Sequence, residues 1–316
     1  MVILVSELTI QADQLVKNGI TNSTKATYSA PQRQFFQFCL KIVIQALPAN
    51  DQTILLFLTH LHNKKLSYNT CKVYMSAIKS LHLLNNLVPP NFQNPRFRLA
   101  LRAIKNKSPE PTKKNPITFN VMKMIWPLLY KANNELCIKA MLTLAFFGGL
   151  RGSEFLTTIH STGPTVNCIS FQSSTKGTVM KFQVVKSKTK PHGFSMPYMC
   201  SGHKICALCD MEHYLEHRNK MGTLSPNSPL FEMEGKQVTK QVMSAILKKL
   251  IQKLGLSTEG YSLHSIRYGA TTTAAKNKFA DWELKLIGGW STNTYRTYIN
   301  TRQSKHRARF SKRLTQ

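Results

Sequence analysis

Apolar residues in the first 107 positions recur at the spacing of helices rather than of strands. Tyr74, Ile78 and Leu81 follow the i, i+4, i+7 stripe of an amphipathic helix. Two earlier apolar segments contain Phe35, Phe36, Phe38 and Leu40, and then Ile54, Leu55, Phe57, Leu58 and Leu61. Capping side chains precede the later two helices: Asn50 or Asp51, and Ser67 or Asn69. The pattern therefore predicts a helical domain over residues 1–107.

The apolar pattern stops at residues 106–116, which read N-K-S-P-E-P-T-K-K-N-P. Three prolines with several lysines, and no other apolar residue, are the composition of an extended linker. We place a domain boundary at residues 108–117. The same composition also fits a simple exposed loop.

Residues 118–300 combine buried helices with short strands. Residues 118–130 and 135–147 are apolar enough for two buried helices, the second ending at a glycine pair. Strand composition is found at 165–172 and 178–185, joined by a hairpin connection, and a short strand is expected at 228–231. A helix is expected at 239–254, with Val242, Ile246 and Leu250 on one face. The predicted fold class is mainly α with a small antiparallel β-sheet in the second domain.

The charge of the chain is far from neutral. A formal charge of +29, from 43 basic and 14 acidic residues, makes a polyanion the expected partner, and nucleic acid is the first choice. A ribosomal or a membrane-surface protein is the alternative, because either can carry such a charge. Neither needs a chain of this length with an ordinary content of apolar residues, so both are less favoured. The DNA-binding candidates are Lys64, Lys65, Lys72, Lys79, Arg96, Arg98, Arg102 and Lys105. A solvated basic face is the alternative for these residues.

Seven cysteines and no convincing secretory leader favour a reducing, intracellular setting. The longest apolar run, residues 141–150, is too short to span a bilayer and is typical of a buried helix. Cys200, His203, Cys206 and Cys209 offer the ligand types of a zinc site, although their spacing is tighter than the usual pair of knuckles. The alternative is that Cys206 and Cys209 open a helix at 207–218 and pack as small apolar groups.

The segment 262–300 contains residues suited to phosphate chemistry. His264 and Arg267, three apart, would share one helix face, and a guanidinium can meet two phosphate oxygens at once. The indole of Trp290 can only donate a hydrogen bond, which fits a phosphate oxygen. Tyr295 and Tyr298 are both candidates for a nucleophilic hydroxyl. Taken singly, the first two residues also fit a surface pair, and the tryptophan fits a core position.

Two further basic residues stand in short motifs. Arg151 lies in G-L-R-G-S-E, where Glu154 is placed either to orient the guanidinium or to remain a surface carboxylate. Lys188 lies in S-K-T after the second predicted strand, between Lys186 and Lys190. Alternating lysines also serve to blunt the edge of a sheet.

Together, G-L-R-G-S-E, H-S-I-R-Y-G-A and G-G-W-S-T-N-T-Y-R-T-Y-I resemble the motifs of the tyrosine recombinases, also called the phage-integrase family. The wording is most similar to eukaryotic mobile-element integrases of the Crypton type and tyrosine-recombinase retroelements. A glycine-glycine-tryptophan stands where leucine-glycine-histidine is more common. The resemblance implies a catalytic set of Arg151, Lys188, His264, Arg267, Trp290 and Tyr298, with the second of the two tyrosines as nucleophile.

The resemblance also implies a two-domain clamp on double-stranded DNA, with a core-binding domain at 1–107, a catalytic domain at 118–300 and a basic tail at 301–316. The implied reaction is strand cleavage and rejoining through a 3′-phosphotyrosyl bond for integration of a mobile element. No cofactor and no catalytic metal are expected. We expect the protein to assemble on DNA as a dimer to tetramer and to be located in the nucleus. The alternatives are a catalytically silent DNA-binding protein and a type IB topoisomerase-like enzyme.

Overall fold

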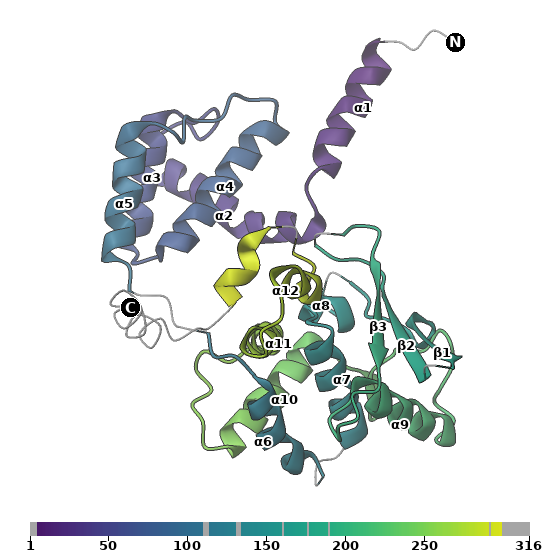
Figure 1. Ribbon diagram of the computed structural model, residues 1–316. Helices are drawn as coiled ribbons and strands as arrows, with labels where there is room; N and C mark the ends of the chain where they lie inside the picture. The colour runs from purple at the N-terminus through teal and green to yellow at the C-terminus, as the bar shows by residue number, and fades with distance from the viewer. Residues whose placement is uncertain are drawn as a thin grey trace. The chain divides into compact units, whose positions relative to one another are not determined.

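The computed structural model describes residues 5–109, 114–130, 134–159, 161–175, 177–188, 190–290 and 292–298, with Ser174, Thr297 and Tyr298 described by their backbone alone. The chain divides into two compact units, Met1–Pro111 and Thr112–Gln316 (Figure 1). The division falls inside the segment predicted as a linker. The predicted tail, 301–316, lies outside the described residues.

All the regular secondary structure described in the first unit is α-helical. Its helices are α1 (Val5–Asn18), α2 (Asn22–Lys41), α3 (Asp51–Asn63), α4 (Tyr68–Leu84) and α5 (Pro95–Lys107). Side-chain caps begin two of them as the sequence predicts, because Asn50 accepts from the N–H of Thr53 at 2.8 Å and Ser67 accepts from that of Thr70 at 3.2 Å.

The apolar stripes of α2, α3 and α4 meet in the core of this unit. Phe35, Phe57, Leu61 and Ile78 are fully buried there. His82 adds a contact that periodicity does not predict: its Nε2 accepts from the N–H of Ala49 at 2.8 Å, and Nδ1 lies 2.8 Å from the Ile78 carbonyl. This buried imidazole ties α4 to the segment before α3.

The second unit is built around α7, which is buried from Cys137 to Phe146. In chain order its other elements are α6 (Phe119–Leu129), α7 (Glu135–Phe147), α8 (Gly152–Phe155), η1 (Val166–Cys168), β1 (Ile169–Ser174), β2 (Gly177–Val184), β3 (Phe194–Met199), α9 (Ala207–Lys220), β4 (Glu232–Met233), β5 (Lys236–Gln237), α10 (Lys240–Lys253), α11 (His264–Lys276), α12 (Asp281–Gly288) and η2 (Asn293–Tyr298). Helices α9 and α11 both pack on α7 (Figure 1).

Three antiparallel strands form a small sheet in the order β1-β2-β3. Met180, Phe182 and Val184 of the central strand alternate into the core. The sequence predicts β2 within one residue, but β1 begins four residues later than predicted because Val166–Cys168 form η1. It does not predict β3, whose Pro197 interrupts the strand pattern. Proline is tolerated there because β3 is an edge strand of this sheet. The predicted fold class, mainly α with a small antiparallel sheet, is confirmed.

Two details of the second unit differ from expectation. Residues 228–231 form only an isolated bridge, at Pro229, and not the predicted strand. The carbonyls of Pro229 and Leu230 accept hydrogen bonds from the Arg218 guanidinium and are therefore occupied. The two short strands β4 and β5 follow directly after this segment. In α10 the buried residues are Met243, Leu247, Leu250 and Ile251, whereas Val242 is 44% exposed. The buried face is therefore rotated by one residue from the predicted one. No helix in the described ranges is both long and apolar enough to cross a membrane.

Candidate active site

Arg267 is a buried anchor of the second unit. It lies on α11, is 1% exposed, and donates from Nη1 to the Gly149 carbonyl at 2.6 Å and from Nη2 to the Gly288 carbonyl. Its Cζ lies 4.2 Å from the centroid of the Trp290 ring, a cation–π contact. One guanidinium therefore joins α11 to the turn after α7 and to the end of α12.

The start of α11 is held against the segment that leads into the second unit. The N–H of Ile117 donates to the Ser265 carbonyl at 2.8 Å, and that of Asn115 donates to the Gly260 carbonyl at 3.0 Å. A Cβ at Gly269 would lie 1.7 Å from the Ile117 carbonyl oxygen. The glycine that follows the H-x-x-R motif thus permits the close packing expected of it.

Arg151 lies at the start of α8, two residues after Gly149, and is held by a carboxylate. Its Nη1 donates to Glu154 Oε1 at 2.7 Å, and its backbone N–H donates to Glu154 Oε2 at 2.7 Å. The Glu154 side chain is 1% exposed, against 23% for that of Arg151. Glu154 is therefore a buried partner that orients the guanidinium, and not a surface carboxylate.

The segment that follows β2 contacts the same carboxylate. The hydroxyl of Ser187, which is buried, donates to Glu154 Oε1 at 2.8 Å. Lys188 follows directly and is exposed, as is Lys186. Lys190 is also exposed, with its Nζ 4.7 Å from the centroid of the Phe194 ring. The hydrogen bond from Ser187 to Glu154 therefore positions the neighbouring Lys188 close to Arg151.

His264 lies among positive charges. Burial and then the charges of Lys114, Arg267, Arg151 and Lys240 lower the pKa of His264 to about 4. The imidazole is therefore neutral at physiological pH. Both predicted arginines act on this one histidine, so the residues of two distant motifs meet in one electropositive site.

Lys240 and Lys114 belong to this site although the sequence did not single them out. Lys240 begins α10, and its Cε would lie 3.6 Å from a Cβ placed at Gly152. Lys114 is exposed and lies in the segment predicted as a linker, where the sequence gives no reason to expect a site residue. Neither residue stands in a motif, so only the packing of α8, α10 and α11 reveals them.

Trp290 and Tyr295 fix the segment after α12. A Cβ at Gly288 would lie 2.0 Å from the Trp290 ring, so this close approach requires glycine. Tyr295 is 1% exposed and packs with Ala274 and Leu284, and its hydroxyl accepts from Arg296 Nε at 3.2 Å. Tyr295 thus anchors η2 in the fold. Tyr298 ends η2, and its side chain lies outside the described residues.

The remaining predicted residues lie in other places. The DNA-binding candidates of the first unit, Lys64, Lys65, Lys72, Lys79, Arg96, Arg98, Arg102 and Lys105, are all exposed. Of the four metal-ligand candidates, Cys200, Cys206 and Cys209 come together, with their Sγ atoms all within 4.8 Å of one another. His203 does not join them, and its Nδ1 accepts from the N–H of Ile205 at 3.0 Å.

Comparison with known proteins points in one direction. No protein-family model matches the chain. An integrase/recombinase XerD homolog of Selenomonas ruminantium is 23% identical over 285 residues, covering 85% of this chain and 79% of the relative.

Three solved structures share the fold. The XerH site-specific recombinase bound to palindromic difH substrate has a TM-score of 0.63 at 16% identity, covering 90% of this chain and 78% of its own. A lambda integrase dimer bound to a COC′ core site has a TM-score of 0.61 at 14% identity, covering 95% and 96%. The Tn1549 transposon integrase in complex with transposon right end DNA has a TM-score of 0.60 at 15% identity, covering 95% and 98%.

The chain therefore has the fold of these recombinase and integrase structures. In sequence the chain is similar to a protein described as an integrase/recombinase.

Proposed function

We propose that this protein is a site-specific DNA recombinase that cleaves and rejoins strands through a 3′-phosphotyrosyl intermediate. The observation that carries the proposal is the convergence of Arg151, His264 and Arg267 on one site of a tyrosine recombinase fold. Two guanidiniums at one place suit the concentrated negative charge of a phosphoryl transition state. The sequence relative is itself described as an integrase/recombinase.

The chemistry follows from the side chains. The hydroxyl oxygen of Tyr298 attacks phosphorus, the bond from phosphorus to the 5′ oxygen breaks, and the strand is held through its 3′ phosphate. His264, which is neutral, assists the transfer of the tyrosine proton, and Lys188 donates a proton to the departing oxygen. Arg151, Arg267 and Trp290 stabilise the charge on phosphate. Attack by another strand's 5′ hydroxyl then reverses the step, so bond energy is retained.

Tyr298 is the preferred nucleophile because Tyr295 already has a structural place. The ring of Tyr295 is buried in a small apolar cluster, and its hydroxyl accepts from Arg296. Moving that hydroxyl to a phosphate would empty the cluster and break this hydrogen bond. Tyr298 is the second tyrosine of the motif, the position of the nucleophile in the family that the motif resembles.

Covalent capture tests the nucleophile without knowledge of the target sequence. The full chain would be incubated with a pool of duplexes of random sequence, each with one nick, and protein–DNA adducts that survive denaturant would be isolated. We expect an adduct whose modified peptide contains Tyr298. Tyr298→Phe should abolish the adduct and leave DNA binding unchanged.

Tyr295→Phe is the matched control. It should form the adduct and lose about 1 kcal/mol of stability with its hydrogen bond. An adduct that persists in Tyr298→Phe and disappears in Tyr295→Phe would assign the chemistry to the other tyrosine. Relaxation of supercoiled plasmid without any strand exchange would favour a topoisomerase instead.

The finer features of the proposal are its partners and setting. We propose that the protein assembles on double-stranded DNA as a dimer to tetramer, with its two units clamping the duplex, and that it serves a mobile element of the eukaryotic type. The lambda integrase structure, described as a dimer on its core site, supports the assembly, and the integrase of the transposon Tn1549 supports a mobile element. The eukaryotic type is proposed from the resemblance of the G-G-W-S-T-N-T-Y-R-T-Y-I motif alone. Crosslinking of the protein with and without captured DNA tests the assembly, and a monomer on DNA would contradict it.

We also propose a nuclear location. The basic composition of residues 301–316 and the seven cysteines, none of them disulfide-bonded, support it. A fluorescent fusion of the full chain should concentrate in the nucleus, and a fusion ending at residue 300 should do so less. Equal cytoplasmic distribution of both fusions would refute this location.

A further inference from the structure

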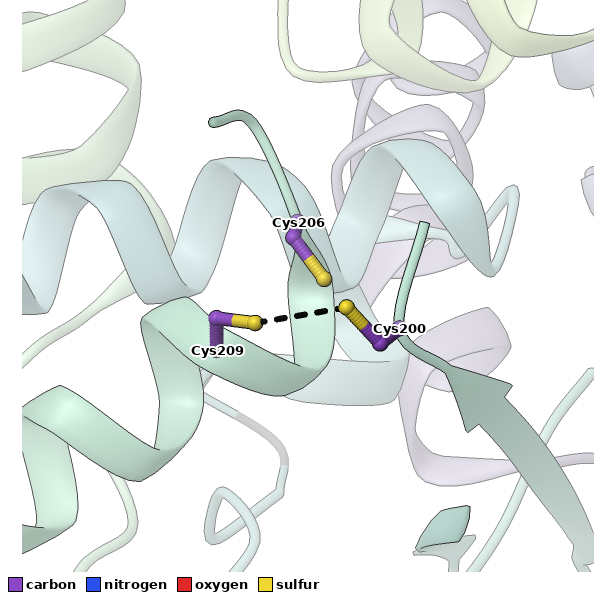
Figure 2. Close-up of side chains that lie close together, drawn as sticks. All are labelled: Cys200, Cys206 and Cys209. Atoms are coloured by element: carbon purple, nitrogen blue, oxygen red, sulfur yellow. Dashed lines mark hydrogen bonds between the residues drawn. The ribbon is translucent and has the colours of Figure 1, made fainter. Parts of the chain in front are cut away.

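Three thiols converge where β3 ends and α9 begins. Cys200 directly follows β3, while Cys206 caps α9 and Cys209 lies in its first turn. Figure 2 shows the three Sγ atoms directed toward one another from these two elements. All three lie within 4.8 Å of one another, although Cys200 is six positions from Cys206 in the chain.

The spacing of the sulfurs matches that of a tetrahedral metal site. Thiolate ligands at about 2.3 Å from zinc, at tetrahedral angles, lie about 3.8 Å from one another. The Sγ atoms of Cys200 and Cys209 are 3.7 Å apart. A disulfide would need the sulfurs at about 2.05 Å, so these two are placed as neighbours and not as a bonded pair.

The surroundings of Cys206 favour a thiolate. The backbone N–H of Ser201 points at Cys206 Sγ, with nitrogen and sulfur 3.4 Å apart. Cys206 and Cys209 lie at the amino end of a 14-residue helix, where the helix dipole favours negative charge. Small apolar packing, the alternative weighed from sequence, does not explain why an exposed Cys200 joins the other two.

We propose that Cys200, Cys206 and Cys209 bind one Zn²⁺, with a water molecule in the fourth tetrahedral position. His203 is not assigned to that position, because its Nδ1 accepts from the N–H of Ile205 and its ring lies edge-on to Phe119. The ion joins the edge strand of the sheet to α9, and α9 packs on α7. The site is independent of the proposed strand-exchange chemistry.

Metal analysis of the full-length protein, purified without chelator under reducing conditions, tests the site. We expect about one zinc per chain. Cys200→Ser and Cys209→Ser should each lose most of it, whereas Cys168→Ser, a buried thiol of the same unit, should retain it. His203→Ala should also retain the metal, and its loss there would overturn the assignment of water to the fourth position.

Cobalt substitution of the unaltered protein keeps the test valid if the cysteine variants fail to fold. Co²⁺ should give a thiolate charge-transfer band and the intense visible bands of a tetrahedral ion, and added Zn²⁺ should remove both. Chelator should lower the melting temperature reversibly. Absence of these bands, or a Cys200–Cys209 disulfide in place of metal, would overturn the proposal.

Discussion

The two arginines of the site are oriented by different means. Arg267 is buried and donates to two backbone carbonyls, whereas Arg151 is partly exposed and paired with the Glu154 carboxylate. Backbone partners fix a guanidinium through the fold, while a carboxylate fixes it through a single side chain. The orientation of Arg151 can therefore be altered by one substitution with little change in shape.

Glu154→Gln removes that charge and keeps the side-chain volume. Because Glu154 accepts from Arg151 and Ser187, we expect the rate of covalent adduct formation to fall at least about tenfold, the equivalent of roughly 1.4 kcal/mol. DNA affinity should be nearly unchanged, since Arg151 keeps its charge. Single-turnover adduct formation measures the rate, and Ser187→Ala, which also loosens Lys188, should show a smaller loss. A variant that cleaves at the original rate would contradict the orienting role.

The lowered pKa of His264 predicts a pH-dependent stability. The unfolded histidine binds a proton below its ordinary pKa of about 6.5, while the folded one stays neutral down to about 4. In this window the unfolded state binds more protons, so the free energy of unfolding must fall as the pH falls. The destabilisation caused by His264 is absent above a pH of about 6.5 and is greatest below a pH of about 4.

His264→Gln isolates this effect from other titrating groups. Asp210, whose pKa is raised to about 6, mainly by burial, changes stability in the opposite sense in the same range, and it does so in both proteins. Urea denaturation should show the unaltered protein losing stability relative to the variant as the pH drops from about 6.5 to about 4. A difference between the two proteins that does not change with pH would mean that the histidine is not desolvated.

At the scale of elements, α5 presents the most regular basic surface of the first unit. Arg98, Arg102 and Lys105 are exposed at i, i+4 and i+7, while Phe97 and Ile104 are buried. A helix with one apolar and one basic face matches a phosphate-binding element that also belongs to a core.

Replacing Arg98, Arg102 and Lys105 with alanine tests this face. If each residue contacts one phosphate, the slope of log affinity against log salt should fall by up to about 2.7, at roughly 0.9 per contact. The matched control replaces Lys248, Lys249 and Lys253, which are exposed on α10 and carry the same total charge. Equal losses in both variants would attribute the effect to net charge and not to α5.

Elements also show where local pattern is insufficient. The buried face of α10 is one residue away from the expected stripe because its neighbours in the core, and not its own periodicity, decide which side is covered. The strand β3 was missed for a related reason, since pairing with β2 compensates for the proline in its sequence.

At the scale of the molecule, each unit has its own hydrophobic core. Phe57 lies in the core of the first unit and Leu142 in that of the second, and both are fully buried. With separate cores, the two units should respond separately to loss of packing.

Phe57→Ala should destabilise the first unit by about 3–5 kcal/mol, and Leu142→Ala the second by about 2–5 kcal/mol. Hydrogen exchange resolved by peptide should show faster exchange in the unit that carries the change, with little effect in the other. Faster exchange throughout the chain for either variant would indicate one cooperative core in place of two.

The sequence by itself determined most of the helices, two of their caps, the central hairpin and the charge that favours a polyanion. These depend on neighbours a few positions apart or on total composition, so they can be predicted before folding. The catalytic set came from the resemblance of the motifs to a known family. Only the tertiary structure decided that Glu154 binds Arg151, that Lys114 and Lys240 surround His264, that Tyr295 is an anchor, and that three cysteines meet. Glu154 lies only three residues from Arg151, and there the fold decided that the carboxylate is buried against the guanidinium and not exposed to solvent. The contacts around His264 join segments far apart in the chain, and only the packing of helices and strands against one another brings them within reach.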